Sequence, residues 1–423
     1  MDRQTSNHAT VIAGAGQAAS EAAFALRQKG YPGRVTMLGD EHYPPYQRPP
    51  LSKGYLAGKM DLEALYLKAD ALYARQDVEL RTRTRVARID RSSKEIALES
   101  GEMLRYDSLI LATGGRPRLL NVAGHGSTGS RPTNLHYLRT ADDALLIREC
   151  LAPGRRIVIV GGGYIGLEVA ATAASAGTHV TVLEAQSRVL ARVTAPEMSE
   201  FYSQMHTGAG VEIRLCSQVE AFELDTSGTR VRAVVCSDGT VIAADAVVVG
   251  IGLVPNIELA AAAGLSIDNG IATDADGRTS DPDIFAIGDC SSRPSTIYGR
   301  RIRLESVPAA LEHARAAAAA LCGAPRPAEA VPWFWSDQYD VKLQIVGLSE
   351  GYDQLIVRGS PSKRQFVAFY VKQNRVVAAD AVNAPAVFMQ AKRVVAQQWP
   401  LVDIDALGRE DAQLQAAFEV PAH

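Results

Sequence analysis

The chain has 423 residues, of which 47% are hydrophobic and 22% charged, and its formal net charge is −3. At roughly 150 residues per domain, this length predicts about three domains, and the composition excludes a disordered, collagen-like or coiled-coil protein. The near balance of charge also argues against a globally basic nucleic-acid binder.

The first chemically informative segment is a short apolar strand, residues 10–13, that leads into a glycine-rich turn and an alanine-rich helix. In such a turn Gly14 permits the sharp bend, and Gly16 lets backbone N–H groups approach a pyrophosphate. Ala19 is small enough for the helix to pack closely on the strand. The helix N-terminus then faces the phosphates with its positive dipole end. This pattern predicts a dinucleotide site.

An acidic residue completes this first pattern. The next apolar strand, residues 34–38, ends just before Asp40 and Glu41. An acid at this point of a dinucleotide-binding unit accepts hydrogen bonds from the adenosine ribose hydroxyls. We expect Asp40 to do so, with Glu41 as the alternative.

The same pattern recurs in the middle of the chain. The strand at residues 156–160 runs into a turn that contains Gly161, Gly163 and Gly166, and the following strand ends at Glu184. Two complete patterns in one chain imply two nucleotide sites, which we interpret as one tightly held FAD and one exchangeable nicotinamide dinucleotide.

Glu184 indicates which nicotinamide dinucleotide binds. A carboxylate at this position accepts from the ribose 2′-hydroxyl and repels a 2′-phosphate, so we expect NADH rather than NADPH. Arg188, four residues on, could weaken that preference.

Further strand-and-turn segments at residues 109–115, 247–256 and 283–290 set the expected domain order. The first dinucleotide-binding fold is interrupted by the second and then resumes. We predict an FAD-binding domain at 1–115 and 246–325, an NAD-binding domain at 116–245, and an α+β C-terminal domain at 326–423. The last is richer in alternating strand patterns.

Long motifs give the chain a family resemblance. It resembles the FAD-dependent, NADH-using ferredoxin reductases of bacterial oxygenase systems, which have the glutathione-reductase-like α/β fold. The motifs that carry the resemblance are Arg48–Lys53, Ala112–Arg118, Gly161–Ala171, Gly250–Asn256, Ile287–Cys290, Glu305–Pro308 and Pro332–Gln338.

The resemblance implies an activity. It implies an NADH:ferredoxin oxidoreductase that takes a hydride from NADH and passes single electrons to a [2Fe-2S] ferredoxin, which supplies a cytochrome P-450 monooxygenase. The alternatives are a rubredoxin reductase or the ferredoxin reductase component of a dioxygenase. A less favoured alternative is a flavoprotein of the apoptosis-inducing-factor type.

The resemblance also implies catalytic residues. It places Lys53 beside the flavin N5 with Glu168 as its partner, and a cation there stabilises the electron-rich reduced ring. Tyr164 is expected to cover the flavin face and to move aside for nicotinamide. The alternatives are a surface lysine, an acid on a helix surface and an ordinary packing tyrosine.

Further cofactor contacts follow from the same resemblance. Asp289 is expected to accept from the ribityl hydroxyls, and Val307 to donate its backbone N–H to the flavin from a helix N-terminus that favours the reduced ring. The remaining expected FAD contacts are Arg48, Arg116, Arg139 and Trp335.

The five cysteines are scattered and form no C-x-x-C, so the sequence has neither metal-site spacing nor a neighbouring redox pair. This usage fits a reducing cytoplasm. We interpret Cys290, which follows Asp289, as a small buried residue.

The sequence has neither a secretory signal nor a run of 18 or more apolar residues, so we expect a cytoplasmic protein with no membrane or nucleic-acid partner.

Overall fold

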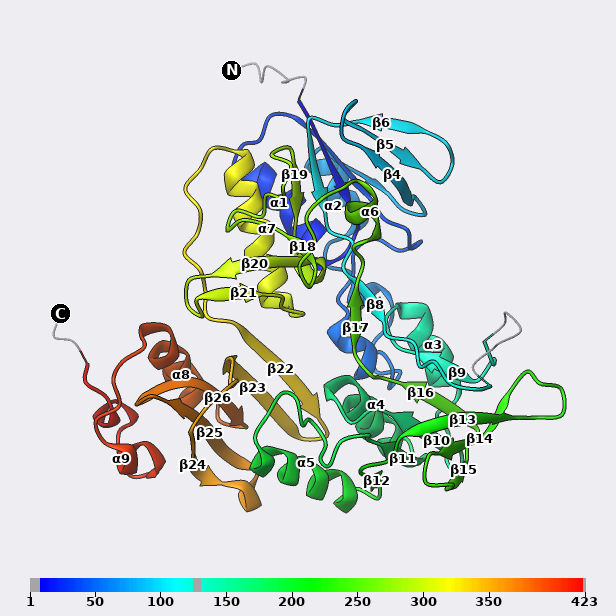
Figure 1. Ribbon diagram of the computed structural model, residues 1–423, viewed down its shortest axis with the longest axis vertical. Helices are drawn as coiled ribbons and strands as arrows, with labels where there is room; N and C mark the ends of the chain where they lie inside the picture. Colours follow the sequence, from blue (N-terminus) through cyan, green and yellow to red (C-terminus); the bar gives the residue numbers. More distant parts are fainter. Residues whose placement is uncertain (1–7, 125–130, 421–423) are drawn as a thin grey trace. The chain divides into compact units, whose positions relative to one another are not determined.

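The computed structural model describes residues 8–124 and 131–420, and the chain divides into two compact units. Unit 1 comprises Met1–Gln47, Glu63–Arg116 and Val254–Pro332, and unit 2 comprises Arg48–Leu62, Pro117–Leu253 and Trp333–His423. Figure 1 shows the elements of both units. Within the described ranges, no helix is both long and apolar enough to cross a membrane.

Unit 1 is built on a parallel sheet in the order β19-β7-β1-β2-β3. Ile12 lies level with Met37 on one side and Ile110 on the other, and all three are fully buried. Strands covered on both faces read as continuous apolar runs, which is why the sequence signal was clear. The strands are β1 (Ala9–Ala13), β2 (Arg34–Leu38), β3 (Val78–Arg81), β7 (Ser108–Leu111) and β19 (Ile284–Ala286).

Two small-residue helices, α1 (Gln17–Gln28) and α7 (Val307–Leu321), pack against each other beside this sheet (Figure 1, blue and yellow). Buried alanines such as Ala22 and Ala314, both at 0% exposure, let the two backbones approach closely.

Smaller elements complete unit 1. An antiparallel sheet contains β4 (Val86–Asp90), β5 (Glu95–Leu98) and β6 (Met103–Arg105), and a second small sheet contains β18 (Ile271–Ala272), β20 (Ser291–Ser295) and β21 (Arg300–Ile302). The short helices are α2 (Asp70–Arg75), α6 (Glu258–Ala262), η2 (Glu63–Leu65) and η3 (Gly288–Cys290). The chain passes between the units within β8 (Gly115–Pro117) and β17 (Leu253–Pro255).

Unit 2 contains a second parallel sheet, in the order β12-β11-β10-β16-β9. Its strands are β9 (Leu135–Tyr137), β10 (Arg156–Val160), β11 (His179–Leu183), β12 (Glu212–Arg214) and β16 (Ala246–Val249). Its helices are η1 (Pro49–Ser52), α3 (Ala141–Glu149), α4 (Tyr164–Ser175) and α5 (Pro196–Gly208). An antiparallel sheet of β13 (Val219–Leu224), β14 (Val231–Cys236) and β15 (Val241–Ala243) follows in the chain.

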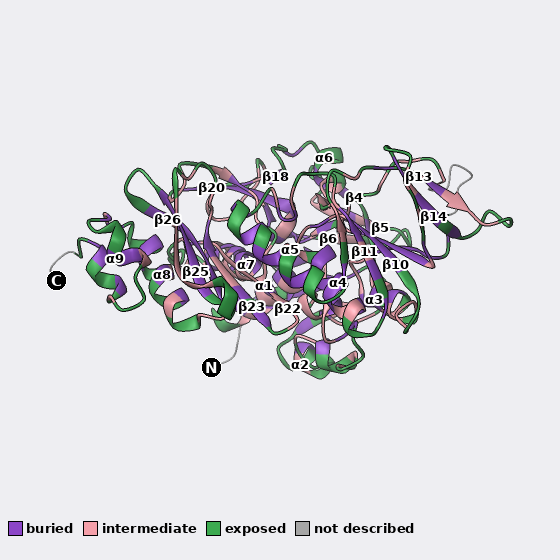
Figure 2. Ribbon diagram, turned by 90° about the horizontal axis from the view of Figure 1, so that it is seen from below, coloured by how far each residue is buried: buried purple, intermediate pink, exposed green. Residues whose placement is uncertain are grey.

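The C-terminal part of unit 2 is an antiparallel sheet in the order β22-β23-β26-β25-β24. Figure 2 colours β25 and β26 largely as buried. The strands are β22 (Trp333–Gln338), β23 (Val341–Gly347), β24 (Gln354–Ser360), β25 (Gln365–Lys372) and β26 (Arg375–Val382). The helices are α8 (Pro385–Gln397), α9 (Ile404–Gly408), η4 (Pro361–Lys363) and η5 (Leu414–Ala417).

Both predicted strand–turn–helix–strand units are confirmed. The strands expected at residues 10–13, 34–38 and 156–160 are β1, β2 and β10, and each glycine turn leads directly into a helix. The alternating patterns expected in the C-terminal region also form strands of one antiparallel sheet.

A buried carboxylate helps to hold that sheet against the segment before α5. The Oδ2 atom of Asp380 accepts hydrogen bonds from the hydroxyls of Thr194 and Tyr370, each at 2.6 Å. The Tyr370 hydroxyl in turn accepts from the backbone N–H of Ala195 at 3.1 Å. Burial raises the pKa of Asp380 from 3.8 to about 6, and the two hydroxyl donors offset part of that rise.

Asp380 therefore predicts a pH dependence of stability. Because its pKa is higher in the folded chain, its contribution is fully present below pH 3.8 and is lost as the pH rises through about 6. Asp380→Asn removes this titration. We expect the free energy of unfolding of the wild type, relative to the variant, to fall by on the order of 1 kcal/mol between about pH 5 and pH 8. Urea unfolding at both pH values measures this, and parallel pH profiles would contradict it.

Candidate functional site

The first glycine turn of unit 1 is shaped by close backbone packing. Gly14 has φ +127°, and a Cβ there would lie 2.2 Å from the carbonyl oxygen of Ala112. Gly16 is the N-cap of α1, and a Cβ there would meet nothing within 4 Å. Ala19 is fully buried beneath the turn. The turn therefore leaves open space in front of a helix N-terminus, where N–H groups bind anions.

The acidic residues after β2 differ in their surroundings. Asp40 is exposed at the carboxyl end of the strand, the edge at which ligands of parallel sheets bind. Glu41 is half-buried and accepts a hydrogen bond from the hydroxyl of Tyr46. Asp40 thus presents its carboxylate to solvent beside the glycine turn, whereas Glu41 already has a protein donor.

A second edge position in unit 1 carries Asp289. It lies in the one-turn helix η3, after Gly288, whose φ is +73°. The ring Nδ1 of His313, from α7, accepts from the backbone N–H of Gly288 at 3.3 Å. Burial lowers the pKa of His313 to about 3, so the ring is neutral and Nδ1 remains an acceptor. This buried histidine, which holds the turn that carries Asp289, was not predicted from the sequence.

Val307 opens α7, as expected. The side chain of Ser306 caps the helix by accepting from the backbone N–H of Ala309 at 3.3 Å, and Pro308 occupies the first turn. Ser–x–Pro is a common start for a helix, because proline lacks the N–H that would otherwise be unpaired. Val307 is half-buried, so its backbone lies near the surface of unit 1.

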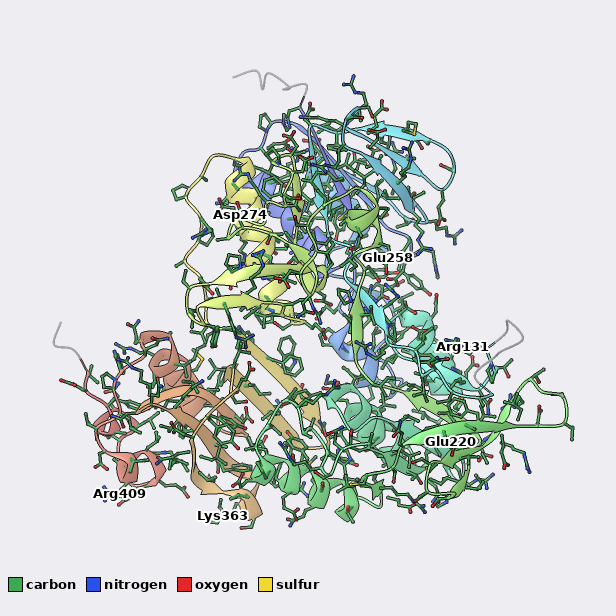
Figure 3. All side chains as sticks on the ribbon, in the orientation of Figure 1. Arg131, Glu220, Glu258, Asp274, Lys363 and Arg409 are labelled. Atoms are coloured by element: carbon green, nitrogen blue, oxygen red, sulfur yellow. The ribbon has the colours of Figure 1, made fainter. Side chains whose placement is uncertain are left out.

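Arg116 is bound to protein groups in unit 1. Its Nη1 donates to the side-chain oxygen of Asn256 at 2.8 Å, and its Nη2 lies 2.7 Å from Glu258, which Figure 3 labels. Both members of the ion pair are more than half exposed. An FAD phosphate would compete with these partners for the guanidinium.

The second glycine turn, in unit 2, repeats the geometry of the first. Gly161 has φ +108°, and a Cβ there would lie 2.5 Å from the carbonyl oxygen of Gly250. At Gly166 a Cβ would lie 2.1 Å from the carbonyl oxygen of Gly161. Gly163 caps α4, and a Cβ there would meet nothing within 4 Å. In each turn the first glycine thus packs against a backbone carbonyl oxygen, and the glycine that caps the helix faces open space.

Glu184 is held by the turn itself. Its Oε2 accepts from the backbone N–H of Gly162 at 2.7 Å, and its Oε1 from that of Gln186 at 2.8 Å. Arg188 points its guanidinium into its own loop, where it donates to the carbonyl oxygens of Ala191 and Thr194. Arg188, which could weaken the expected preference for NADH over NADPH, is therefore hydrogen-bonded within its own loop.

Lys53 and Glu168 form a short ion pair in unit 2. The Lys53 Nζ lies 2.6 Å from Glu168 Oε2, and the side-chain exposures are 20% and 1%. Lys53 is the C-cap of η1 in the Pro-Pro-Leu-Ser-Lys segment, and its Nζ also donates to the carbonyl oxygen of Pro49 at 3.1 Å. The pairing expected from the sequence is therefore present, and the carboxylate is deeply buried.

Two serines that the sequence analysis did not single out complete this cluster. Ser52 donates to Glu168 Oε2 at 2.5 Å, and Ser336, from β22, donates to Glu168 Oε1 at 2.6 Å. Both serines belong to the motif segments that carried the family resemblance. Their signal was thus in the sequence, but without a fold nothing connected a serine at 52 to one at 336.

Tyr164 lies on the same helix as Glu168. Its ring packs against Phe334 with 5.2 Å between centroids, and its hydroxyl is buried without a hydrogen-bond partner among the described residues. Burial raises the pKa of Tyr164 well above 10, so the hydroxyl stays protonated. Whether this ring moves remains a prediction.

Three other expected contacts also lie in unit 2. Arg48 donates to the backbone carbonyl oxygen of Arg139 at 2.6 Å, which brings these two arginines together. Trp335 is half-buried on β22, with its ring 5.5 Å from that of Trp333. The structure therefore divides the expected FAD contacts between the units. Unit 1 holds Gly14, Gly16, Ala19, Asp40, Arg116, Asp289 and Val307, and unit 2 holds Arg48, Lys53, Arg139 and Trp335.

Cys290 is fully buried, as expected. Its Sγ lies 3.3 Å from the carbonyl oxygen of Ile287, and burial raises the pKa of the thiol. All five cysteines are free. A buried thiol with a raised pKa has little thiolate character, so Cys290 is a poor nucleophile.

Comparisons with known proteins agree with this geometry. Residues 8–314 match the family model described as pyridine nucleotide-disulphide oxidoreductase, and residues 333–418 match the one described as reductase C-terminal. The chain is 50% identical to putidaredoxin reductase CamA of Pseudomonas putida over 409 residues, covering 97% of this chain and 96% of that protein. It is 43% identical to rhodocoxin reductase of Rhodococcus erythropolis, covering 98% and 95%.

A solved structure is similar over the same length. The crystal structure of the covalent putidaredoxin reductase–putidaredoxin complex contains a chain with a TM-score of 0.94 and 49% identity, covering 97% of this chain and 99% of that chain. The expected glutathione-reductase-like α/β architecture with an added C-terminal domain is confirmed.

The open glycines give a direct test of both expected nucleotide sites. Neither Gly16→Ala nor Gly163→Ala introduces a clash, so both variants should fold normally. If phosphates occupy the open space, a methyl group there should weaken binding roughly tenfold at each site. Gly16→Ala should lower the FAD content of the purified protein, and Gly163→Ala should raise KM for NADH with FAD retained.

Gly208→Ala is the matched control, because a Cβ at that glycine also meets nothing within 4 Å. Absorbance at the flavin band and steady-state kinetics measure both effects. Normal FAD content and normal KM in all three variants would rule out nucleotide binding at these turns.

Proposed function

The chain belongs to the pyridine nucleotide-disulphide oxidoreductase family, and we propose that it is an NADH:ferredoxin oxidoreductase. It is an oxidoreductase that uses FAD and a nicotinamide dinucleotide. When bound, FAD accepts two electrons from the nicotinamide and releases them one at a time. The proposed acceptor is a [2Fe-2S] ferredoxin.

One observation carries the ferredoxin part of the proposal. The likeness to putidaredoxin reductase extends over nearly the whole of both chains, including the C-terminal sheet. The matched crystal structure is named as a complex of that reductase with putidaredoxin.

The glycine turn of unit 1 is the proposed FAD site. Gly14 and Gly16 leave the α1 N-terminus open to a pyrophosphate, and Asp40 offers an exposed carboxylate to the ribose hydroxyls. Asp289, at the same kind of strand end, is the proposed acceptor for ribityl hydroxyls, and the backbone N–H of Val307, the first residue of α7, is the proposed donor to the flavin.

The turn of unit 2 is the proposed NADH site. Backbone donors fix the Glu184 carboxylate, so it presents a fixed negative charge that a ribose 2′-hydroxyl tolerates and a 2′-phosphate does not. Arg188 is engaged by carbonyl oxygens of its own loop, which supports the preference for NADH.

The Lys53–Glu168 pair is the proposed catalytic centre of unit 2. The Lys53 ammonium is a fixed positive charge in a partly dry environment, where it stabilises developing negative charge better than it would in water. Glu168 orients it, and Tyr164, which precedes Glu168 on α4, is the proposed gate over the nicotinamide position.

The proposal also includes the terminal acceptor of the electrons. We assign the electrons ultimately to a cytochrome P-450 monooxygenase, with a rubredoxin or a dioxygenase ferredoxin as the competing acceptors. We keep the division into an FAD-binding domain (1–115 and 246–325), an NAD-binding domain (116–245) and a C-terminal domain (326–423), and a cytoplasmic location.

NADH-driven reduction of cytochrome c tests the acceptor. We expect a saturable stimulation when a [2Fe-2S] ferredoxin is added to the purified yellow protein, with NADPH supporting a much lower rate than NADH. The stimulation should fall as salt rises, since charged partners steer each other to the docking site. Rubredoxin and a dioxygenase ferredoxin are tested in parallel as the competing acceptors. The proposal would be contradicted if no ferredoxin stimulated the reduction of cytochrome c.

A further inference from the structure

A continuous chain of hydrogen bonds leads away from Glu168 through the interior of unit 2. Ser336 Oγ lies 2.6 Å from Glu168 Oε1, and Gln338 Nε2 lies 3.2 Å from Ser336 Oγ. Gln338 Oε1 lies 2.8 Å from His206 Nε2, and the hydroxyl of Tyr339 lies 3.2 Å from His206 Nδ1. The chain thus joins α4, β22 and α5.

Every inner member of this chain is buried. Glu168 and Gln338 are 1% exposed, and Ser336 and His206 are 0% exposed. Ser336 and Gln338 stand two residues apart on one strand, so the pleat directs both side chains to the same face. Polar groups this deep must be paired, so the chain has little freedom to rearrange one link at a time.

The charge on Glu168 fixes the direction of every link. An ionised carboxylate only accepts, so the single Ser336 proton points to Glu168, and Ser336 must accept from the Gln338 amide. The Gln338 carbonyl then faces His206, so His206 must donate from Nε2. A neutral imidazole has one N–H, so Nδ1 accepts from the Tyr339 hydroxyl.

The buried environment of His206 favours a neutral imidazole. Burial lowers the pKa of His206, the hydrogen bond to Gln338 offsetting part of that effect. The Tyr339 ring lies 5.2 Å from the imidazole, centroid to centroid, which leaves the ring enclosed. A neutral imidazole between the Gln338 carbonyl and the Tyr339 hydroxyl has its proton on only one nitrogen, and NMR can identify that nitrogen.

We propose that Ser336, Gln338 and His206 are positioning residues, which hold Glu168 against Lys53 through a hydrogen-bond chain whose direction the charge of Glu168 sets. The proposal rests on the proposed function for the role of the Lys53–Glu168 pair. The chain orients the carboxylate and does not carry protons to it, because the Gln338 amide in its middle cannot pass a proton on without becoming an imidic acid. Its effect is a fixed position for Oε1 and aligned dipoles that stabilise the carboxylate charge.

Replacement of Glu168 by glutamine predicts a reversal of the chain. Lys53 and Ser52 both donate toward Oε2, and an ammonium has no acceptor, so the new amide oxygen must face Lys53. The amide NH2 then faces Ser336 and donates to it. The buried Ser336 proton, which has lost its carboxylate acceptor, stays paired by donating to Gln338, whose amide turns over and donates to His206 Nε2. His206 is left with its proton on Nδ1.

Long-range ¹H–¹⁵N spectra of the FAD-loaded protein with labelled histidine test this directly. The sequence has eight histidines, and His206→Gln assigns the relevant signals. We expect the Nε2–H tautomer in the wild type and the Nδ1–H tautomer in Glu168→Gln. In a Ser336→Ala background the link is cut, so Glu168→Gln should no longer change the tautomer. The same tautomer in wild type and Glu168→Gln would overturn the proposal.

Anaerobic reduction of the bound flavin by NADH supplies the second readout. Ser336→Ala and His206→Leu should each slow reduction roughly tenfold with KM for NADH nearly unchanged, because orientation is lost and nucleotide binding is not. His206→Gln should restore the rate, since its amide can donate where Nε2 does. Equal rates in His206→Leu and the wild type would contradict a positioning role.

His136→Leu is the matched control, because His136 is also a buried histidine of unit 2 but contacts Cys150 instead of this chain. Slowing in this control equal to that in His206→Leu would also contradict the proposal. Failure of every ferredoxin to accept electrons, with the tautomer switch intact, would refute the proposed function and leave the positioning chain standing.

Discussion

The buried carboxylate of Glu168 is the constraint around which unit 2 is organised. A charge at 1% exposure is strongly destabilising unless it is paired, and removal of one partner of such a pair typically costs about 3–5 kcal/mol. Lys53, Ser52 and Ser336 reach it from segments far apart in the sequence. The need to satisfy one carboxylate therefore ties η1, α4 and β22 together, and it keeps the lysine ammonium at a fixed place.

The two glycine turns solve a related problem with backbone instead of side chains. In each, one glycine packs so tightly that a Cβ would overlap a carbonyl oxygen, while the helix-capping glycine faces open space. The packed side fixes the turn, and on the open side no side chain of the described residues caps the helix. Free helix N–H groups suit an anion better than water, which is why the same short sequence pattern recurs at both proposed nucleotide sites.

The sequence could predict those elements whose signal is local. The strand runs, the glycine turns and the acids at strand ends each lie within about ten residues, and the family resemblance added the Lys53–Glu168 pair. Ser336, Gln338, His206 and the buried Asp380 could not be found in this way. Each is polar, unremarkable in its local pattern, and significant only because the fold brings it to a distant partner. Arg116 was predicted from its motif as an FAD contact, but the motif does not contain Glu258, so its ion pair with that residue could not be predicted.

The most direct test of the account is a double-mutant cycle on Lys53 and Glu168, with the rate of anaerobic flavin reduction by NADH as the measurement. If the pair acts as one unit, Lys53→Met and Glu168→Gln each slow reduction by roughly tenfold or more, and the double variant is no slower than the worse single variant. Effects that multiply in the double variant would show that the two residues act independently and would contradict the central claim.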